Sequence, residues 1–123
     1  MLDHIGIDVQ DFEKSIAFYK AALAELGYEL IYEIQGSAGF GVSGNIDFCL
    51  QRGSRIGSGT HVAFRGENRA KVRAFYEAAL KVGGKDNGPP GIREHYHPHY
   101  YGAFVFDPDG YNIEAVCHNP ESA

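Results

Sequence analysis

The chain has 123 residues, the length of one domain that can bury a hydrophobic core without the support of disulfides or structural metals. Its composition, 44% hydrophobic and 22% charged, is typical of a soluble globular protein with both helices and strands. The net charge of −5 and the lack of any Lys/Arg run argue against a nucleic-acid partner, which binds clustered basic side chains.

Targeting signals are not found in the sequence. No apolar run reaches the ~18 residues of a membrane span, and Met1 leads into Leu-Asp-His-Ile without a basic and then apolar leader. We therefore expect a cytoplasmic protein without a membrane anchor. Cys49 and Cys117 lie in apolar, strand-like segments and form no CxxC pair, so we expect buried reduced thiols, with a disulfide as the alternative.

The first half of the chain predicts one strand, one helix and three further strands. Leu2–Val9 alternates with the period of a half-buried strand, and His4 falls on the face opposite the aliphatic residues. Asp11 is a typical N-cap, and apolar residues then recur at helical spacing, which predicts an amphipathic helix at about 11–26. Short strands are expected at 27–35, 38–43 and 46–51, between turns that contain glycine.

The second half of the chain repeats the first. At an offset of 57 residues, nine of the 24 pairs from position 4 to 27 are identical, among them His4 with His61 and the Ala-Phe-Tyr of both helices. A second strand is therefore expected from His61, followed by a second helix at about 68–82. The sequence predicts one domain over 1–123, built from two βαβββ modules at about 1–55 and 58–119.

The last strands of the two halves match at a larger offset. Asn45-Ile-Asp47 pairs with Asn112-Ile-Glu114 at an offset of 67, which makes Asp47 the counterpart of Glu114. The second half thus gains about ten residues, within a predicted loop at 87–101 that carries three histidines in five positions.

Glu114 occupies an unusual place in the predicted structure. Asp107-Pro-Asp-Gly110 has the residue types of a turn, so Phe104–Phe106 and Tyr111–Cys117 should form a hairpin. Glu114 then lies in the middle of an apolar strand, where a carboxylate costs several kcal/mol of desolvation unless it is paired. Such a residue typically belongs to a functional site.

Each half offers a histidine near the start of its first strand and an acid within its last strand. Together His4, His61, Glu114 and Asp47 form a set of N and O donors suited to Mn, Fe, Co, Ni or Zn. The alternative is that each histidine is a surface or hydrogen-bonded core residue, and that the strand of Asp47 presents Phe48 inward. The recurrence of both residue types in both halves favours the metal site.

These motifs resemble those of the vicinal oxygen chelate superfamily, which includes glyoxalase I, bleomycin and fosfomycin resistance proteins and extradiol dioxygenases. The resemblance spans nearly the whole chain and rests on Leu2–Gly6, Ser15–Tyr19, Gly59–Ala63 and Phe106–Glu114. It implies an α+β fold in which two paired βαβββ modules form curled mixed sheets around a metal-binding cavity. It also implies His4, His61 and Glu114 as ligands of a divalent metal, with Asp47 as a fourth ligand or a hydrogen-bond partner.

The same resemblance implies a metal-dependent lyase or isomerase that acts on a small substrate with two adjacent oxygens. Glu114 or Asp47 would then move the proton. An extradiol-type dioxygenase and a non-catalytic protein that sequesters a ligand are the alternatives, because the superfamily uses one scaffold for all of them.

Substrate contacts and self-association are the last expectations. His97 and Tyr101 precede the final hairpin and are expected to contact the substrate, and Arg93 to meet an anionic group; solvated loop residues are the alternative reading. Exposed strand edges predict a homodimer, with each site inside one chain or shared between two.

Overall fold

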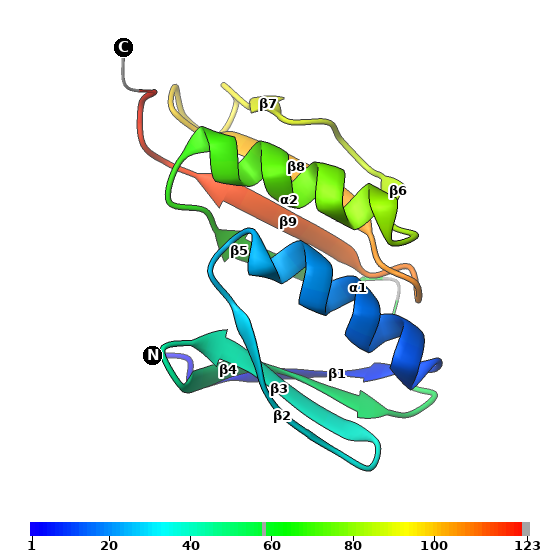
Figure 1. The fold of residues 1–123 in the computed structure, drawn as a ribbon. Coiled ribbons are helices and arrows are strands. Elements are labelled where there is room, and N and C mark those ends of the chain that lie inside the picture. The colour runs from blue at the N-terminus through cyan, green and yellow to red at the C-terminus, as the bar shows by residue number, and fades with distance from the viewer. Residues whose placement is uncertain (58, 122–123) are drawn as a thin grey trace.

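Two βαβββ units follow one another along the chain (Figure 1). The structure is a computed structural model that describes residues 1–57 and 59–121. The first unit consists of β1 (Ile5–Val9), α1 (Phe12–Ala24), β2 (Glu29–Ile34), β3 (Ser37–Val42) and β4 (Asn45–Arg52). Its sheet has the order β1-β4-β3-β2, with β1 parallel to β4 and the other pairs antiparallel, so the expected mixed sheet is confirmed.

The second unit repeats this arrangement with one addition. It consists of β5 (His61–Arg65), α2 (Arg69–Lys81), β6 (Lys85–Asp86), β7 (Gly91–Ile92), β8 (Tyr101–Phe106) and β9 (Asn112–Cys117). Its sheet has the order β5-β9-β8-β6, and β7 also pairs with β8. Two short strands therefore take the place of one, and part of the predicted loop at 87–101 lies in the sheet.

The helices begin where the sequence predicts, because each has a side-chain cap. Asp11 accepts a hydrogen bond from the backbone N–H of Lys14 at 3.1 Å, and Asn68 accepts one from Lys71 at 2.9 Å. Each bond satisfies an N–H group that has no partner within its helix. The hairpin between β3 and β4 turns at Ser43 and Gly44, which both have positive φ, as a tight hairpin turn requires.

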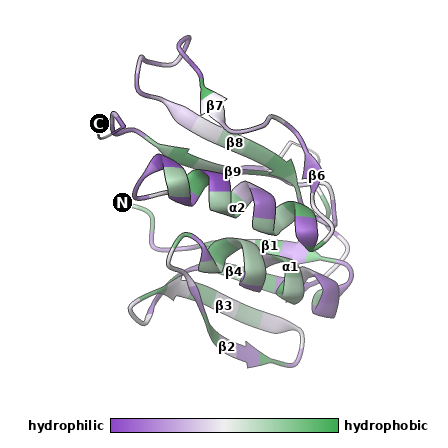
Figure 2. Cartoon of the chain, turned by 45° about the horizontal axis from the view of Figure 1, so that its top comes forward, coloured by the Kyte–Doolittle hydropathy of each residue, from purple (hydrophilic) through white to green (hydrophobic). Residues whose placement is uncertain are grey.

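Both helices lie on the same side of the two sheets (Figure 1). Figure 2 shows α2 alternating between hydrophilic and hydrophobic residues along its length, and its buried residues are Val72, Phe75 and Ala79. Rings join the modules, since Phe48 of β4 and Phe64 of β5 meet edge to face with centroids 5.1 Å apart. Within the described residues, no helix is long and apolar enough to cross a membrane.

The strand register corrects the internal alignment of the two halves. Gly6 lies opposite Cys49 in the first sheet, and Ala63 lies opposite Glu114 in the second. Since Gly6 and Ala63 correspond in the repeat, Cys49 is the counterpart of Glu114, at an offset of 65 rather than 67. The pairing of Asp47 with Glu114 was wrong by two residues, because a match of three residues is too short to define a register.

Candidate functional site

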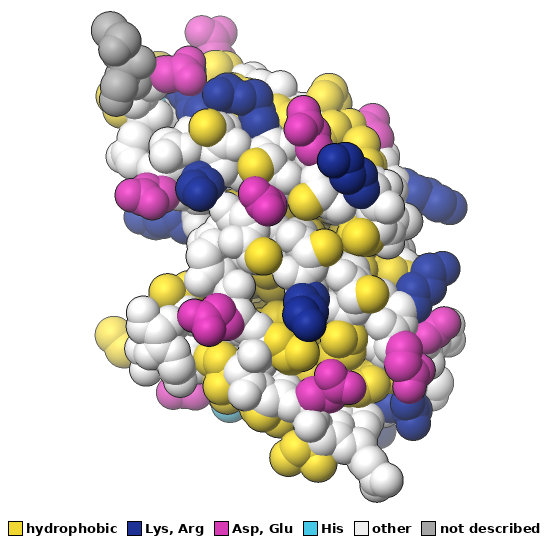
Figure 3. Space-filling view, viewed as in Figure 1, with side chains coloured by type: hydrophobic (Ala, Val, Ile, Leu, Met, Phe, Trp, Pro, Cys, Tyr) yellow, Lys and Arg dark blue, Asp and Glu magenta, His cyan; other side chains and the backbone are white. Residues whose placement is uncertain are grey.

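The face of the second sheet turned away from the helices carries the predicted residues His61 and Glu114. In β5, Val62 and Phe64 are buried, whereas His61 and Ala63 are exposed on the other face. Glu114 joins that other face because it pairs with Ala63. The helix-covered side of the molecule shows almost no histidine surface (Figure 3), in agreement with this placement.

The carboxylate of Glu114 is buried and fully paired. Its side chain is 1% exposed, and its Oε1 lies 2.9 Å from Nε2 of His61. Its Oε2 accepts a hydrogen bond from the hydroxyl of Tyr100. A buried carboxylate needs such partners, because the loss of water is not compensated otherwise. This geometry is consistent with the prediction that the side chains of Glu114 and His61 lie in contact.

Two further residues shape this carboxylate site, and sequence analysis missed both. Burial raises the pKa of the Tyr100 phenol, and the hydrogen bond to Glu114 raises it further. Gly102 leaves room for the carboxylate, since a Cβ there would lie 3.1 Å from Oε2 of Glu114 and 3.2 Å from the ring of Tyr100. The sequence does contain a signal for Gly102. Phe104 lies opposite Glu114, and Gly102, two residues earlier in the same strand, must share the face of Phe104.

Tyr101, which was expected to contact substrate, faces the opposite side of the sheet. Its hydroxyl accepts a hydrogen bond from Nη1 of Arg73 at 3.3 Å, and the Arg69 guanidinium lies over its ring at 5.2 Å. Both arginines belong to α2. Tyr100, one position earlier, is therefore the tyrosine that reaches Glu114.

His4 lies just before β1, which begins at Ile5, and forms no three-donor group with His61 and Glu114 among the described residues. Its side chain is 57% exposed, and its Nδ1 lies 2.8 Å from the Asp3 carboxylate. Residues 1–57 and 59–121 contain no group of three or more His, Cys, Asp or Glu side chains that could hold a metal ion. One chain thus presents an N,O pair, His61 and Glu114, that fits part of a metal site.

Asp47 lies at the junction of the two modules, near His4. Its Oδ2 accepts a hydrogen bond from the Tyr28 hydroxyl at 2.9 Å, and burial, with this bond, raises the pKa of that phenol. A cavity of about 180 Å³ opens here, and it is lined by Leu2, Asp3, His4, Ile5, Tyr28, Asp47, Phe48, Val62, Ala63 and Phe64. A larger cavity of about 740 Å³, between α1 and the β2–β3 turn, contains none of the expected site residues.

The loop before β8 places two of its predicted contacts near the carboxylate site. The Arg93 guanidinium lies 5.4 Å over the Phe104 ring, whose centroid is 6.1 Å from that of His61. Nε2 of His97 lies 2.8 Å from Nδ1 of His118, and Nδ1 of His97 accepts from the backbone N–H of His99. Both ring nitrogens of His97 are engaged, and its ring meets Tyr100 edge to face.

Comparison with known proteins supplies the context for this geometry. Residues 1–115 match the family model of the Glyoxalase/Bleomycin resistance protein/Dioxygenase superfamily. A glyoxalase/bleomycin resistance protein from Albidiferax ferrireducens T118 is 27% identical, with a TM-score of 0.84 over 98% of this chain and 99% of its own. A comparison with curated proteins gives no significant match.

Two solved structures with lower identity share the fold. A glyoxalase-related enzyme from Fulvimarina pelagi is 19% identical, with a TM-score of 0.75 over 100% of this chain and 93% of its own. A mutant fosfomycin resistance protein from Listeria monocytogenes is 22% identical, with a TM-score of 0.70 over 94% of this chain and 88% of its own. That structure contains Mn(II) and a dihydroxypropylphosphonic acid.

Proposed function

Because the chain belongs to the glyoxalase/bleomycin resistance protein/dioxygenase superfamily, we propose that it is a divalent-metal-dependent lyase or isomerase of the glyoxalase type. Its substrate is a small molecule with two adjacent oxygens. The observation that carries the proposal is the contact of 2.9 Å between His61 and a carboxylate, Glu114, that is 1% exposed. A buried acid paired with an imidazole on the open face of a sheet is costly to maintain unless it serves a site.

In this proposal His61 and Glu114 hold the metal, for which Mn(II), present in one structural relative, is the first to test. A divalent ion held there supplies Lewis-acid stabilisation of negative charge on the two substrate oxygens. Tyr100 keeps Glu114 oriented by occupying its second oxygen. Partners of this kind set the geometry of a ligand and tune its affinity for metal.

His4 supplies the third donor from a second copy of the chain. The distribution of donors favours this arrangement, because His4 forms no three-donor group with His61 and Glu114 in the part of the chain that the structure describes. A homodimer then carries two sites, each made from the first module of one chain and the second module of the other.

Proton transfer belongs to a carboxylate in this scheme. Asp47 is the candidate base, because Tyr28 holds its side chain at the rim of a cavity that His4 also lines. A base must lie within hydrogen-bond reach of the proton that it removes. Glu114 is the alternative, and its burial and its contact with His61 make it the better metal donor.

Arg93 and His97 contact the substrate in this proposal. The Arg93 guanidinium lies beside Phe104 and makes no ion pair with any described acid, so it can receive an anionic group of the substrate. Tyr100, rather than Tyr101, is the tyrosine of this loop that lies at the proposed site, because Tyr101 faces α2.

Elemental analysis tests the metal proposal without knowledge of the substrate. The protein, purified without a histidine tag, is incubated with Mn(II), and its metal content is measured after desalting. We expect His61→Ala and Glu114→Gln to lose the metal while the far-UV circular dichroism stays unchanged. His95→Ala is the matched control, because it removes a histidine that contacts only Tyr96 among the described rings.

A non-catalytic ligand-binding protein is the second candidate. It is favoured by the lack of a three-donor group within the described residues of one chain. If metal-free protein binds a small ligand as tightly as metal-loaded protein and forms no product, the enzyme proposal has to be dropped in favour of this one.

A further inference from the structure

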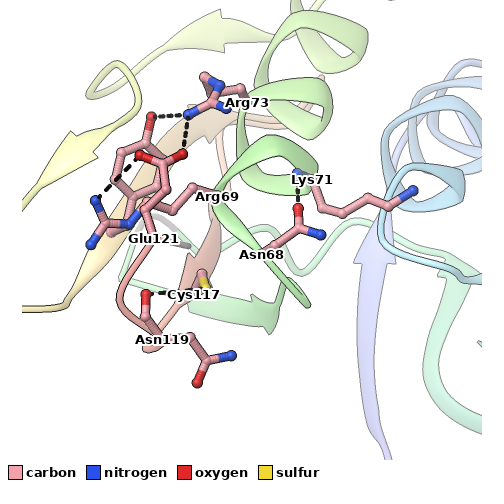
Figure 4. A network of polar contacts seen from close by, with 8 residues as sticks. Asn68, Arg69, Lys71, Arg73, Cys117, Asn119 and Glu121 are labelled. Atoms are coloured by element: carbon pink, nitrogen blue, oxygen red, sulfur yellow. Dashed lines mark hydrogen bonds and ion pairs between the residues drawn. The ribbon is translucent and has the colours of Figure 1, made fainter. Parts of the chain in front are cut away.

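A second cluster of charged residues lies on the other face of the second sheet, where α2 begins. Tyr101 points to this face, because it lies an odd number of positions from Phe104, the residue opposite Glu114. Arg69 and Arg73, one turn apart on α2, both place their guanidinium groups over the Tyr101 ring, at 5.2 and 5.9 Å. Figure 4 shows both arginines directed toward Glu121, whereas Lys71 points away from it.

Arg69 is largely buried and poorly satisfied. Its side chain is 15% exposed, and its Nε has no hydrogen-bond partner among the described residues. Its nearest acid is Glu121, whose Oε2 is 3.9 Å from Nη1, too long for a hydrogen bond. A guanidinium carries five N–H donors, and burying them without acceptors costs free energy.

Arg73 adds a second cation at the same place. Its Nη1 donates to the Tyr101 hydroxyl at 3.3 Å and lies 3.8 Å from Oε1 of Glu121. Glu121 is therefore shared by two arginines without a close hydrogen bond to either. Among the described residues, Glu121 is the acid within 4 Å of either guanidinium, and Glu77 also acts on Arg73 through its charge.

A cavity of about 350 Å³ adjoins Arg69 and Glu121, and Arg73 is not among the described residues that line it. Its lining consists of Glu67, Asn68, Arg69, Ala70, Cys117, Asn119, Pro120 and Glu121. Its volume is ample for a small oxyanion. Glu67 is the other acid on its wall, and it makes no ion pair with Arg69 or Arg73 among the described residues. The stack on Tyr101 holds both guanidinium groups in place before any ligand arrives.

We infer that Arg69 and Arg73 form a binding site for a phosphate group, and that the Glu121 carboxylate occupies this site when no ligand is bound. A phosphate group carries close to two negative charges near neutral pH and three acceptor oxygens. It can therefore offer closer acceptors to both arginines than Glu121 does, and it can accept the Nε–H of Arg69, which has no partner among the described residues. The ligand is a small phosphate-bearing molecule, and it binds on the sheet face opposite Glu114.

Inorganic phosphate is the probe that tests this site. Amide NMR spectra are recorded during a phosphate titration at constant ionic strength, with sodium chloride as the parallel titration. We expect saturable shifts confined to the start of α2 and to residues 117–121, with chloride producing none of comparable size. Shifts that fail to saturate, or that chloride reproduces, overturn the inference.

Charge variants make the test specific. Arg73→Gln should weaken phosphate binding at least about tenfold, because it removes a charge-assisted contact. Glu121→Gln should tighten it about two- to fivefold, since the competing carboxylate is gone. Arg69→Gln should also weaken binding, but Arg73 is the primary test because its side chain is 46% exposed and its replacement disturbs packing less.

Lys71→Gln is the matched control. It removes the same charge from the same turn of α2, and Lys71 points away from the arginine pair (Figure 4). We expect its phosphate affinity to stay within about twofold of the wild type, because its charge acts only at a distance through screened solvent. An equal loss in Lys71→Gln and Arg73→Gln shows general charge attraction and refutes the site.

Discussion

The buried carboxylate of Glu114 depends on a phenol that the sequence does not mark. Tyr100 is one of several aromatic residues in a polar loop, and only the fold brings its hydroxyl to Oε2 of Glu114. His97 and His118 both pack edge to face on its ring, so this part of the loop is held against the end of β9. The contact links the loop to the metal donors that we propose.

Tyr100→Phe is expected to weaken metal binding about 10- to 100-fold, because it removes the partner that orients a ligand. The unfolding free energy should fall by about 1–3 kcal/mol, since the buried Oε2 loses its donor. Chelator competition measures the first effect and urea unfolding the second. Tyr96→Phe, at a residue 58% exposed, should change neither. Equal metal affinity in Tyr100→Phe and wild type contradicts the assigned role.

Asp107 is a second buried acid, and its role is to hold the last turn. It accepts hydrogen bonds from the Tyr19 hydroxyl and from the backbone N–H groups of Asp109 and Tyr111. Burial raises the pKa of its carboxyl, and these hydrogen bonds oppose the shift only in part. The folded state therefore binds this proton more tightly than the unfolded chain does.

The stability due to Asp107 should consequently depend on pH. A raised folded-state pKa gives stability that is present below the unfolded pKa, about 3.9, and is lost as pH rises through the folded pKa. The side chain of Asp107→Asn cannot ionise, so this variant does not lose stability in the same way. The difference between its unfolding free energy and that of the wild type should therefore increase in favour of the variant as pH rises from about 4. Urea unfolding over a series of pH values measures this difference, and a flat difference argues against the shift.

Strand β8 makes room for the site through a glycine. Gly102 faces Glu114 and Tyr100, whereas Gly6 of β1 faces open space, with only Cβ of Cys49 at 4.0 Å from an added Cβ. Both glycines lie in strands and neither has a positive φ, so the two positions differ mainly in their neighbours. They form a matched pair for substitution.

Gly102→Ala is expected to cost about 1–3 kcal/mol of unfolding free energy, because the new methyl group displaces the carboxylate or the phenol. Metal binding should weaken with it. Gly6→Ala should stay close to the wild type in thermal melting and in metal content. The converse result, with Gly6→Ala the more damaging variant, is incompatible with the geometry around Glu114.

The three proposed donors come from both modules and form no three-donor group within the described residues of one chain, which gives the proposed dimer a direct test. A site shared between chains needs His4 from one copy and His61 with Glu114 from the other. A mixture of His4→Ala and His61→Ala proteins then forms heterodimers with one intact site and one doubly damaged site.

Mixing the two variants after mild unfolding and refolding should restore about a quarter of the wild-type metal capacity, since half of the dimers are heterodimers with one good site of two. Neither variant alone should bind metal. Elemental analysis reads out the result, and sedimentation at micromolar concentration checks the dimer. No recovery on mixing means that each chain carries its own site or none.

Local sequence was sufficient to predict most of the architecture. The caps at Asp11 and Asn68 and the helical and strand periods appear within short windows, and the 57-residue repeat appears when the two halves are aligned. Together they predict two βαβββ modules that the structure contains. Glu114 could be singled out for the same reason, because the local sequence alone shows an acidic residue in the middle of an apolar strand, before any contact partner is known.

Only the tertiary structure decided which side chains meet. Because side chains alternate between the faces of a strand, an error of one residue in the predicted register exchanges Tyr100 for Tyr101. An error of two residues keeps the face but exchanges Cys49 for Asp47 as the counterpart of Glu114. Register depends on pairing between segments far apart in the chain, such as β5 with β9, and no short window contains that information. The arginine pair over Tyr101 is likewise formed by α2, β8 and the residues after β9, which come together only in the folded chain.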